Sequence, residues 1–256
     1  MIRTRSVILA LTIALVAVAC GADDSSTNGL EDPGDCTVID LAVSPEKRDL
    51  LTELAQDFNA SDRAQNGDGC FFARVQSKSS GGAAQLLAGT WDEDIEGPRP
   101  VIWSPSASTW GAIVNQRLDQ QGEPAITGDF TSFQLTPLVI AMPKPMAQEA
   151  LGFADILALS QDPVGWAAHG HPEWGAFRLG KTNPNFSTSG LSALLAQAYA
   201  ANGKTVGLSI EDLAKPSTDA FARAIESSVV HYGDTTLTFL NNWYRADQRG
   251  NPYGYV

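Results

Sequence analysis

The residues best suited to hold a ligand lie at positions 180–190, where a predicted strand runs into a predicted helix. Apolar side chains recur over residues 191–198 at the spacing of an amphipathic helix, and Gly203 can end that helix. Its first turn holds Thr188, Ser189 and Gly190, whose backbone N–H groups have no partner inside the helix. Such N–H groups bind anions or carbonyl oxygens. The alternative interpretation is a capped structural helix that binds nothing.

Three other segments have the same design of small residues at a helix start. Residues 78–82 and 104–108 each follow a predicted strand, and residues 232–236 join two predicted helices. Ligands in open α/β sheets lie beyond the carboxyl ends of the strands, so turns that converge there predict a binding site. The predicted ligand-binding residues are Ser79, Ser80, Gly81, Ser104, Ser106, Thr188, Ser189, Gly190, Tyr232 and Asp234.

The charge of the chain limits the class of ligand. A formal net charge of −12 argues against nucleic acid, which needs a basic surface. It does not exclude a small anion, because neutral N–H and O–H donors can hold a desolvated anion without a cation. Lys78 and Lys181 lie beside two of the turns, where they either add charge-assisted hydrogen bonds or remain solvated.

Catalytic and metal-binding patterns are weak in this sequence. No G-x-S-x-G motif marks a nucleophile, so we expect no enzymatic activity, no catalytic residues and no cofactor. His169, His171 and Glu173 are residue types that bind metals, but one H-x-H in a loop is not a metal motif. We therefore predict no metal site.

The N-terminus has the pattern of an export signal over residues 1–20. Arg3 and Arg5 precede the apolar run 7–16, which is too short for a good membrane span. Residues 17–19 fit an A-x-A cleavage site, which would give a secreted protein, whereas Cys20 with its neighbours looks like a bacterial lipobox. We prefer lipidation of Cys20, because it accounts for the odd one of three cysteines. The polar residues 21–35 are then a disordered tether that holds the protein at the cell membrane.

The other two cysteines form an even pair in an oxidising compartment. Cys36 and Cys70 each begin a predicted strand, at residues 36–43 and 70–76. If a crossover helix joins these strands, they are parallel and their starts lie within disulfide distance. The alternative is two buried free thiols.

Strands and helices alternate along the mature chain, which predicts an α/β fold with parallel sheets. A 43% apolar content over 256 residues supports one large domain or two modest ones. A helix over residues 45–58 should bury Leu50, Leu51, Leu54 and Phe58, and a later one Trp110, Val114 and Leu118. Further predicted strands are 100–103, 138–142 and 176–179. Further predicted helices are 82–88, 155–159, a helix with Phe221, Ala224, Ile225 and Val229 on one face, and 234–246.

Several segments give the chain a resemblance to bacterial extracellular solute-binding proteins of type II architecture, in particular to actinobacterial lipoproteins often fused to a von Willebrand factor A domain. The segments that carry this resemblance are 129–133, 135–144, 170–175, 177–190 and 231–236. It implies two three-layer αβα lobes, at residues 36–132 and 133–256, that close over a ligand for delivery to a membrane importer. In molybdate- and sulfate-binding relatives, hydroxyls and N–H groups hold the ligand in turns that match Ser79, Ser80, Ser106, Thr188 and Ser189.

The resemblance and the turns together predict a membrane-anchored solute-binding protein that binds a small molecule, such as an oxyanion, for an ABC-type permease. One alternative is a sensing or interaction module of a von Willebrand factor A-containing envelope protein, and another is an envelope hydrolase. In the family fold the chain returns to lobe one, whereas residues 253–256 resemble the start of a strand. We therefore expect a C-terminally truncated fold in which lobe one is incomplete.

Overall fold

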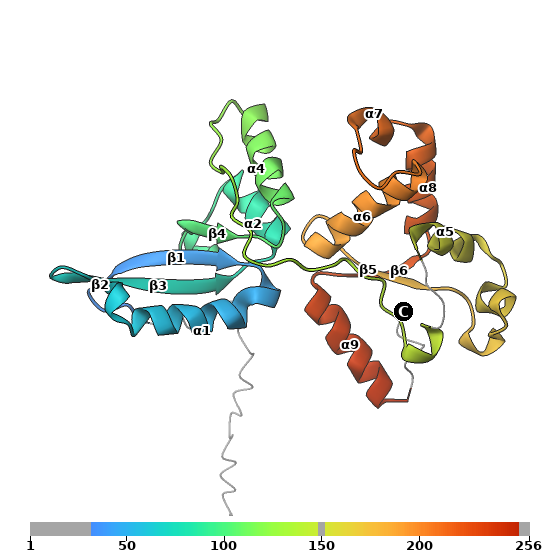
Figure 1. Ribbon diagram of the computed structural model, residues 1–256, viewed down its shortest axis with the longest axis horizontal. Helices are drawn as coiled ribbons and strands as arrows, with labels where there is room; N and C mark the ends of the chain where they lie inside the picture. The colour runs from blue at the N-terminus through green and yellow to red at the C-terminus, as the bar shows by residue number, and fades with distance from the viewer. Residues whose placement is uncertain (1–31, 148–151, 251–256) are drawn as a thin grey trace, which may run out of the picture.

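The computed structural model describes residues 32–147 and 152–250, which form two groups of helices and strands (Figure 1). We call these groups the N-terminal and C-terminal lobes. The predicted signal peptide with Cys20, most of the predicted tether and the strand-like residues 253–256 lie outside the described residues. Within the described ranges, no helix combines the length and the apolar character needed to cross a membrane.

The N-terminal lobe contains a mainly parallel sheet with strand order β2-β3-β1-β4. β1 pairs in parallel with both β3 and β4, while the short β2 runs antiparallel to β3. The carboxyl ends of the three parallel strands therefore meet at one edge of the sheet. The strands are β1 (Thr37–Val43), β2 (Gln65–Asn66), β3 (Gly69–Ser77) and β4 (Ile102–Ser104).

Helices cover this sheet, and one of them supplies most of the core. Buried Trp110, Val114 and Leu118 of α4 pack against Ala84 and Leu87 of α2, as the apolar spacing of α4 predicts. The helical segments are the 3-10 turns η1 (Pro45–Lys47) and η2 (Asp62–Ala64), with α1 (Arg48–Asn59), α2 (Ser80–Leu87), α3 (Glu93–Glu96) and α4 (Thr109–Gln120).

The predicted inner face of α1 is wrong by about one residue. Leu50 and Leu54 are exposed, and the half-buried positions are Leu51, Ala55 and Phe58. Leu51, Ala55 and Phe58 recur at the i, i+4, i+7 spacing of one helix face, whereas Leu50 and Leu54 each precede that face by one residue, which turns them about 100° away from it.

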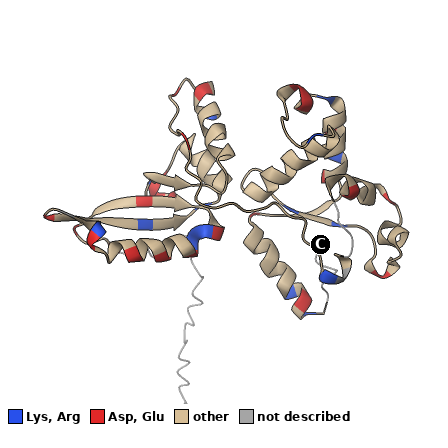
Figure 2. Ribbon diagram, in the orientation of Figure 1, with Lys and Arg blue, Asp and Glu red and all other residues tan. Residues whose placement is uncertain are grey.

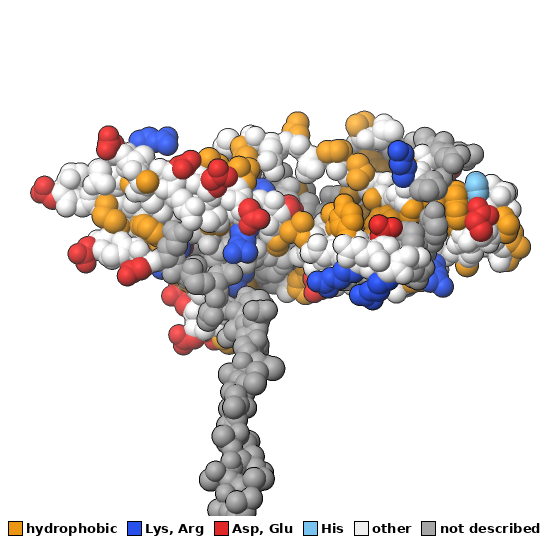
Figure 3. All heavy atoms as spheres, turned by 90° about the horizontal axis from the view of Figure 1, so that it is seen from below, with side chains coloured by type: hydrophobic (Ala, Val, Ile, Leu, Met, Phe, Trp, Pro, Cys, Tyr) orange, Lys and Arg blue, Asp and Glu red, His pale blue; other side chains and the backbone are white. Residues whose placement is uncertain are grey.

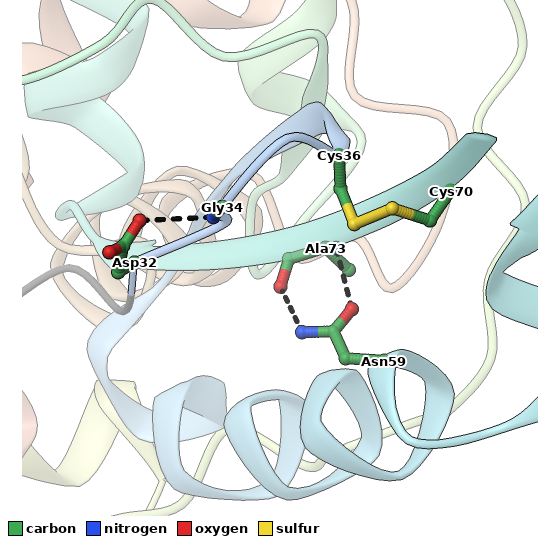
Figure 4. The surroundings of a disulfide bond; sticks show 6 residues. All are labelled: Asp32, Gly34, Cys36, Asn59, Cys70 and Ala73. Carbon is green, nitrogen blue, oxygen red and sulfur yellow. Dashed lines mark hydrogen bonds between the residues drawn. A yellow bond between two sulfur atoms is a disulfide. The ribbon is translucent and has the colours of Figure 1, made fainter.

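A disulfide joins Cys36 to Cys70 at the start of β1 and β3, with a Cα–Cα distance of 4.7 Å (Figure 4). The two strands are parallel and joined through α1, as predicted. Asn59, near the end of α1, also binds β3, because its amide accepts from Ala73 N at 2.7 Å and donates to Ala73 O at 3.0 Å (Figure 4).

The C-terminal lobe is built around the parallel strands β5 and β6. In Figure 1, α9 lies on one side of this sheet and α5, α6 and α8 lie on the other. The strands are β5 (Leu179–Thr182) and β6 (Val229–Gly233), and the helices are α5 (Phe153–Gln161), α6 (Thr188–Ala201), α7 (Ile210–Leu213), α8 (Pro216–Glu226) and α9 (Thr236–Gln248), with 3-10 turns η3 (Lys144–Met146), η4 (Gly165–His169) and η5 (Pro172–Trp174).

The predicted core strand at residues 138–142 is wrong. This run belongs to the linker, residues 121–143, which has no helix or strand and joins the two lobes. Val139 is 68% exposed and Leu135 is 95% exposed, so a continuous apolar run does not by itself ensure burial. A strand needs a neighbour for its backbone hydrogen bonds, and β5 and β6 pair with each other instead. Figure 3 shows hydrophobic side chains at the surface of both halves of the molecule.

The two strands of the C-terminal lobe also differ from prediction. β5 begins at Leu179, where the sequence predicted a strand to end. β6 was missed, because Val229 follows Ile225 at helical spacing and so was assigned to the preceding helix. Residues 232–236 therefore connect a strand to a helix, which is the geometry of the other predicted binding turns.

Candidate ligand-binding site

One small pocket lies where the two lobes meet. Its cavity volume is about 10 Å³, close to the minimum that holds one water molecule. The N-terminal lobe contributes the starts of η1 and α2, and the C-terminal lobe contributes the starts of α6 and α9. The lining residues are Pro45, Glu46, Ser79, Ser80, Phe186, Ser187, Thr188, Asp234, Thr235 and Thr236.

The start of α6 presents free N–H groups to this junction. Ser187 occupies the cap position, but its side chain caps no backbone N–H. The N–H groups of Thr188, Ser189 and Gly190 have no acceptor among the described residues. The opening turn of α6 therefore has three donors that an oxygen-bearing ligand can use.

A cluster of hydroxyls joins this turn to β5 and to the start of α9. The Ser189 hydroxyl lies 2.7 Å from Thr182 Oγ1, 3.0 Å from Ser187 Oγ and 3.0 Å from Thr236 Oγ1. A side chain at Gly190 would meet Thr182 O at 2.2 Å, so glycine lets α6 start directly against β5. Ser189 and Gly190 thus position the turn and do not line the pocket.

The start of α2 forms the opposite wall. Ser79 caps α2 by accepting from Gly82 N at 3.2 Å. Ser80 is 3% exposed, and its Oγ accepts from Ser106 N at 3.0 Å. Both serines line the pocket.

Three hydrogen bonds among the described residues join the lobes: Gln85 Nε2 donates to Asn185 O at 3.5 Å, and two shorter bonds lie beside the pocket. Gly81 N donates to Phe186 O at 2.9 Å, and Trp110 Nε1 donates to Thr188 Oγ1 at 2.8 Å. A Cβ atom at Gly81 would lie 2.0 Å from Asn185 O. Glycine is therefore required for this close contact between α2 and the turn before α6.

The predicted residues Ser104 and Ser106 do not line the pocket, and their hydroxyls form hydrogen bonds with residues 44–47 of the same lobe. The Lys47 ammonium donates to Ser104 Oγ at 2.7 Å and to Pro105 O at 2.9 Å. The Ser106 hydroxyl lies 2.7 Å from Ser44 Oγ and donates to Glu46 Oε1. Burial lowers the pKa of Lys47, and the neighbouring Glu46 carboxylate opposes that shift.

Tyr232 lies outside the pocket and binds a carboxylate within the C-terminal lobe. Its hydroxyl donates to Glu226, which also accepts from Lys181 and Gln197. Burial and the bond to Glu226 raise the pKa of Tyr232 to about 12. Burial alone would raise the pKa of Glu226, but its bonds to Lys181, Tyr232 and Gln197 together lower it. Asp234, two residues after Tyr232, does line the pocket.

Of the ten predicted binding residues, the pocket brings together Ser79, Ser80, Thr188 and Asp234. Phe186, Ser187, Thr235 and Thr236 lie in the predicted segments 180–190 and 232–236 but were not among the ten, and Pro45 and Glu46 lie outside every predicted segment. Pro45 and Glu46 could have been found, because they follow a strand and open a helical turn as the predicted segments do.

A family model described as "Bacterial extracellular solute-binding protein" matches residues 39–248. No curated protein matches the chain. No solved structure matches it either.

Proposed function

The chain belongs to the bacterial extracellular solute-binding protein family, and on that premise we propose that it is an extracytoplasmic lipoprotein that captures a small solute between its lobes. Cys20 is the proposed lipid anchor, and an ABC-type permease is the proposed recipient of the solute. The site binds the ligand through oxygen atoms, such as those of an oxyanion or a carboxylate.

One observation carries this proposal: four helical starts from two lobes line a single pocket. Serine and threonine hydroxyls surround it, and Thr188 at the start of α6 adds a backbone N–H group without an acceptor among the described residues. A ligand oxygen placed there would receive hydrogen bonds from both lobes at once. Binding would then stabilise the contact between the lobes.

The pocket volume of about 10 Å³ sets a condition on binding. A ligand larger than one water molecule enters only when the lobes move apart. Opening requires the Gly81–Phe186 and Trp110–Thr188 bonds to break. We therefore expect ligand capture to be coupled to a change in the distance between lobes.

A thermal-shift panel with the full chain tests the proposal. The panel holds molybdate, sulfate, phosphate, amino acids and sugars, since a ligand selective for the folded state raises the melting temperature. At one hundred times its Kd, a ligand adds about 2.7 kcal/mol of stability. The proposal expects at least one compound to raise the melting temperature, and Ser80→Ala and Thr188→Ala to reduce that shift.

The matched control is Ser227→Ala, because the hydroxyl of Ser227 donates to Ala224 O on α8, away from the pocket. This variant should keep the full ligand-induced shift. A panel in which no compound raises the melting temperature, or a shift that both pocket variants retain, would contradict the proposal.

A further inference from the structure

The pocket between the lobes carries negative charge and no positive charge. Among its ten described lining residues, Glu46 and Asp234 are the charged ones, and they come from opposite lobes. Acidic residues are also spread over both lobes (Figure 2), within a chain of net charge −12. A fully deprotonated oxyanion in this pocket would meet a carboxylate on each side.

The lysines nearest to the binding turns form hydrogen bonds or ion pairs with groups that do not line the pocket. Lys47 donates to Ser104 Oγ and Pro105 O. Lys78 pairs with Glu96 at 2.6 Å, and Lys181 pairs with Glu226. Lys78 and Lys181 thus each pair with a carboxylate outside the pocket. Among the described residues no salt bridge joins a lysine to Glu46 or Asp234, and Lys47 acts on Glu46 only through the charge that opposes its own pKa shift.

The same pocket also has donors that need an acceptor. The side chain of Ser80 is only 3% exposed, and its Oγ already accepts a hydrogen bond from Ser106 N. The hydroxyl hydrogen of Ser80 has no acceptor among the described residues, although Ser80 lines the pocket. The backbone N–H of Thr188, which also lines the pocket, likewise has no acceptor among the described residues. The pocket therefore requires both oxygen acceptors and a positively charged donor from its ligand.

We infer that the ligand is a zwitterion of the amino-acid class. Its carboxylate accepts from the Ser80 hydroxyl and from the Thr188 N–H, and its ammonium group donates to Glu46 and Asp234. Each ligand charge then meets groups of complementary character, which a sulfate-like dianion does not achieve. This inference rests on the proposed solute-binding function and names the ligand class for the same pocket.

Calorimetric titration of the full chain tests the inference with three matched sets of compounds. The first set is glycine and the other standard amino acids, the second is the carboxylic acids that lack the ammonium group, and the third is the amines that lack the carboxylate. Sulfate and molybdate form a fourth set. We expect at least one amino acid to bind, and its matched acid and amine to bind at least tenfold more weakly.

Two variants of the pocket and two controls complete the test. Glu46→Gln and Asp234→Asn should each weaken amino-acid binding at least tenfold, whereas Glu53→Gln and Asp57→Asn on the exposed surface of α1 should not change it. If sulfate or molybdate binds and Glu46→Gln tightens that binding, the zwitterion is wrong while the solute-binding function stands. If none of these compounds binds, both the zwitterion and the binding function at this pocket are contradicted.

Discussion

At the scale of single residues, the junction between the lobes depends on a few exact contacts. Trp110 is 2% exposed, and its indole N–H has Thr188 Oγ1 as acceptor at 2.8 Å. A buried donor without an acceptor is costly, so the hydroxyl of Thr188 supports the core of the N-terminal lobe although it belongs to the C-terminal lobe.

Replacing Thr188 with valine keeps the shape of the side chain but removes this acceptor. We expect Thr188→Val to lower the free energy of unfolding by about 1–3 kcal/mol, since the Trp110 N–H then stays buried and unpaired. Urea unfolding followed by circular dichroism measures the change. Thr188→Ser, which keeps the hydroxyl, is the control and should lose less; equal stability of the valine variant and the native chain would refute the argument.

At the scale of helices and strands, the sequence predicted the elements whose formation depends on residues close together in the chain. The spacing of Trp110, Val114 and Leu118 was enough to define α4, and parallel strand starts were enough to pair Cys36 with Cys70. Ser209 and Asp212, which have the sequence spacing of a capping box, likewise begin α7.

Elements that depend on distant partners were not predictable in the same way. Strand β6 exists because β5 offers backbone hydrogen bonds to it, while the more apolar residues 138–142 have no such neighbour. The site shows the same division. Ser79, Ser80, Thr188 and Asp234 followed from helix starts, whereas no sequence pattern shows that Lys47 is buried and directed away from the pocket.

The capping residue Asp212 gives the C-terminal lobe a dependence on pH. Hydrogen bonds from Lys204 first, and then from Lys215 and Ser209 N, hold the pKa of Asp212 well below its usual range. A lowered folded-state pKa means that this carboxylate stabilises the fold above the ordinary aspartate pKa of about 3.9. That stabilisation is lost as the pH falls from there through the folded-state pKa.

We therefore expect Asp212→Asn to destabilise the chain more at pH 7 than at pH 3. Urea unfolding at both pH values measures the two differences. Asp219→Asn is the matched control, because Asp219 pairs with Arg223 on the exposed surface of α8, where ion pairs contribute little. A loss for Asp212→Asn that is the same at both pH values would rule out the linkage.

At the scale of the whole molecule, the two lobes meet through backbone as well as side chains. The bond from Gly81 N to Phe186 O brings the start of α2 against the turn before α6. Because Asn185 O fills the space beside the Gly81 Cα, any side chain here acts as a wedge between the lobes.

Gly81→Ala is expected to separate the lobes. Its Cβ would lie 2.0 Å from Asn185 O and 2.7 Å from Trp110 Cη2, so the contact must open, at a cost of about 1–3 kcal/mol. Small-angle X-ray scattering should show a larger radius of gyration than for the native chain. Gly128→Ala, where an added Cβ meets nothing within 4 Å, should leave the radius unchanged; an unchanged radius for Gly81→Ala would mean that the lobes absorb the methyl group without opening.

The exposed linker has a consequence for the solubility of the protein. Residues 138–142 are apolar and uncharged, and Leu138, Val139 and Ala141 among them are exposed, which are properties of segments that aggregate by forming strands between chains. Pro137 and Pro143 enclose this run, and proline has no backbone N–H to donate to a neighbouring strand. The apolar run is thereby limited to five residues, fewer than the six or seven typical of an amyloid-forming segment. The two prolines thus oppose self-association of the chain through the segment that joins its lobes.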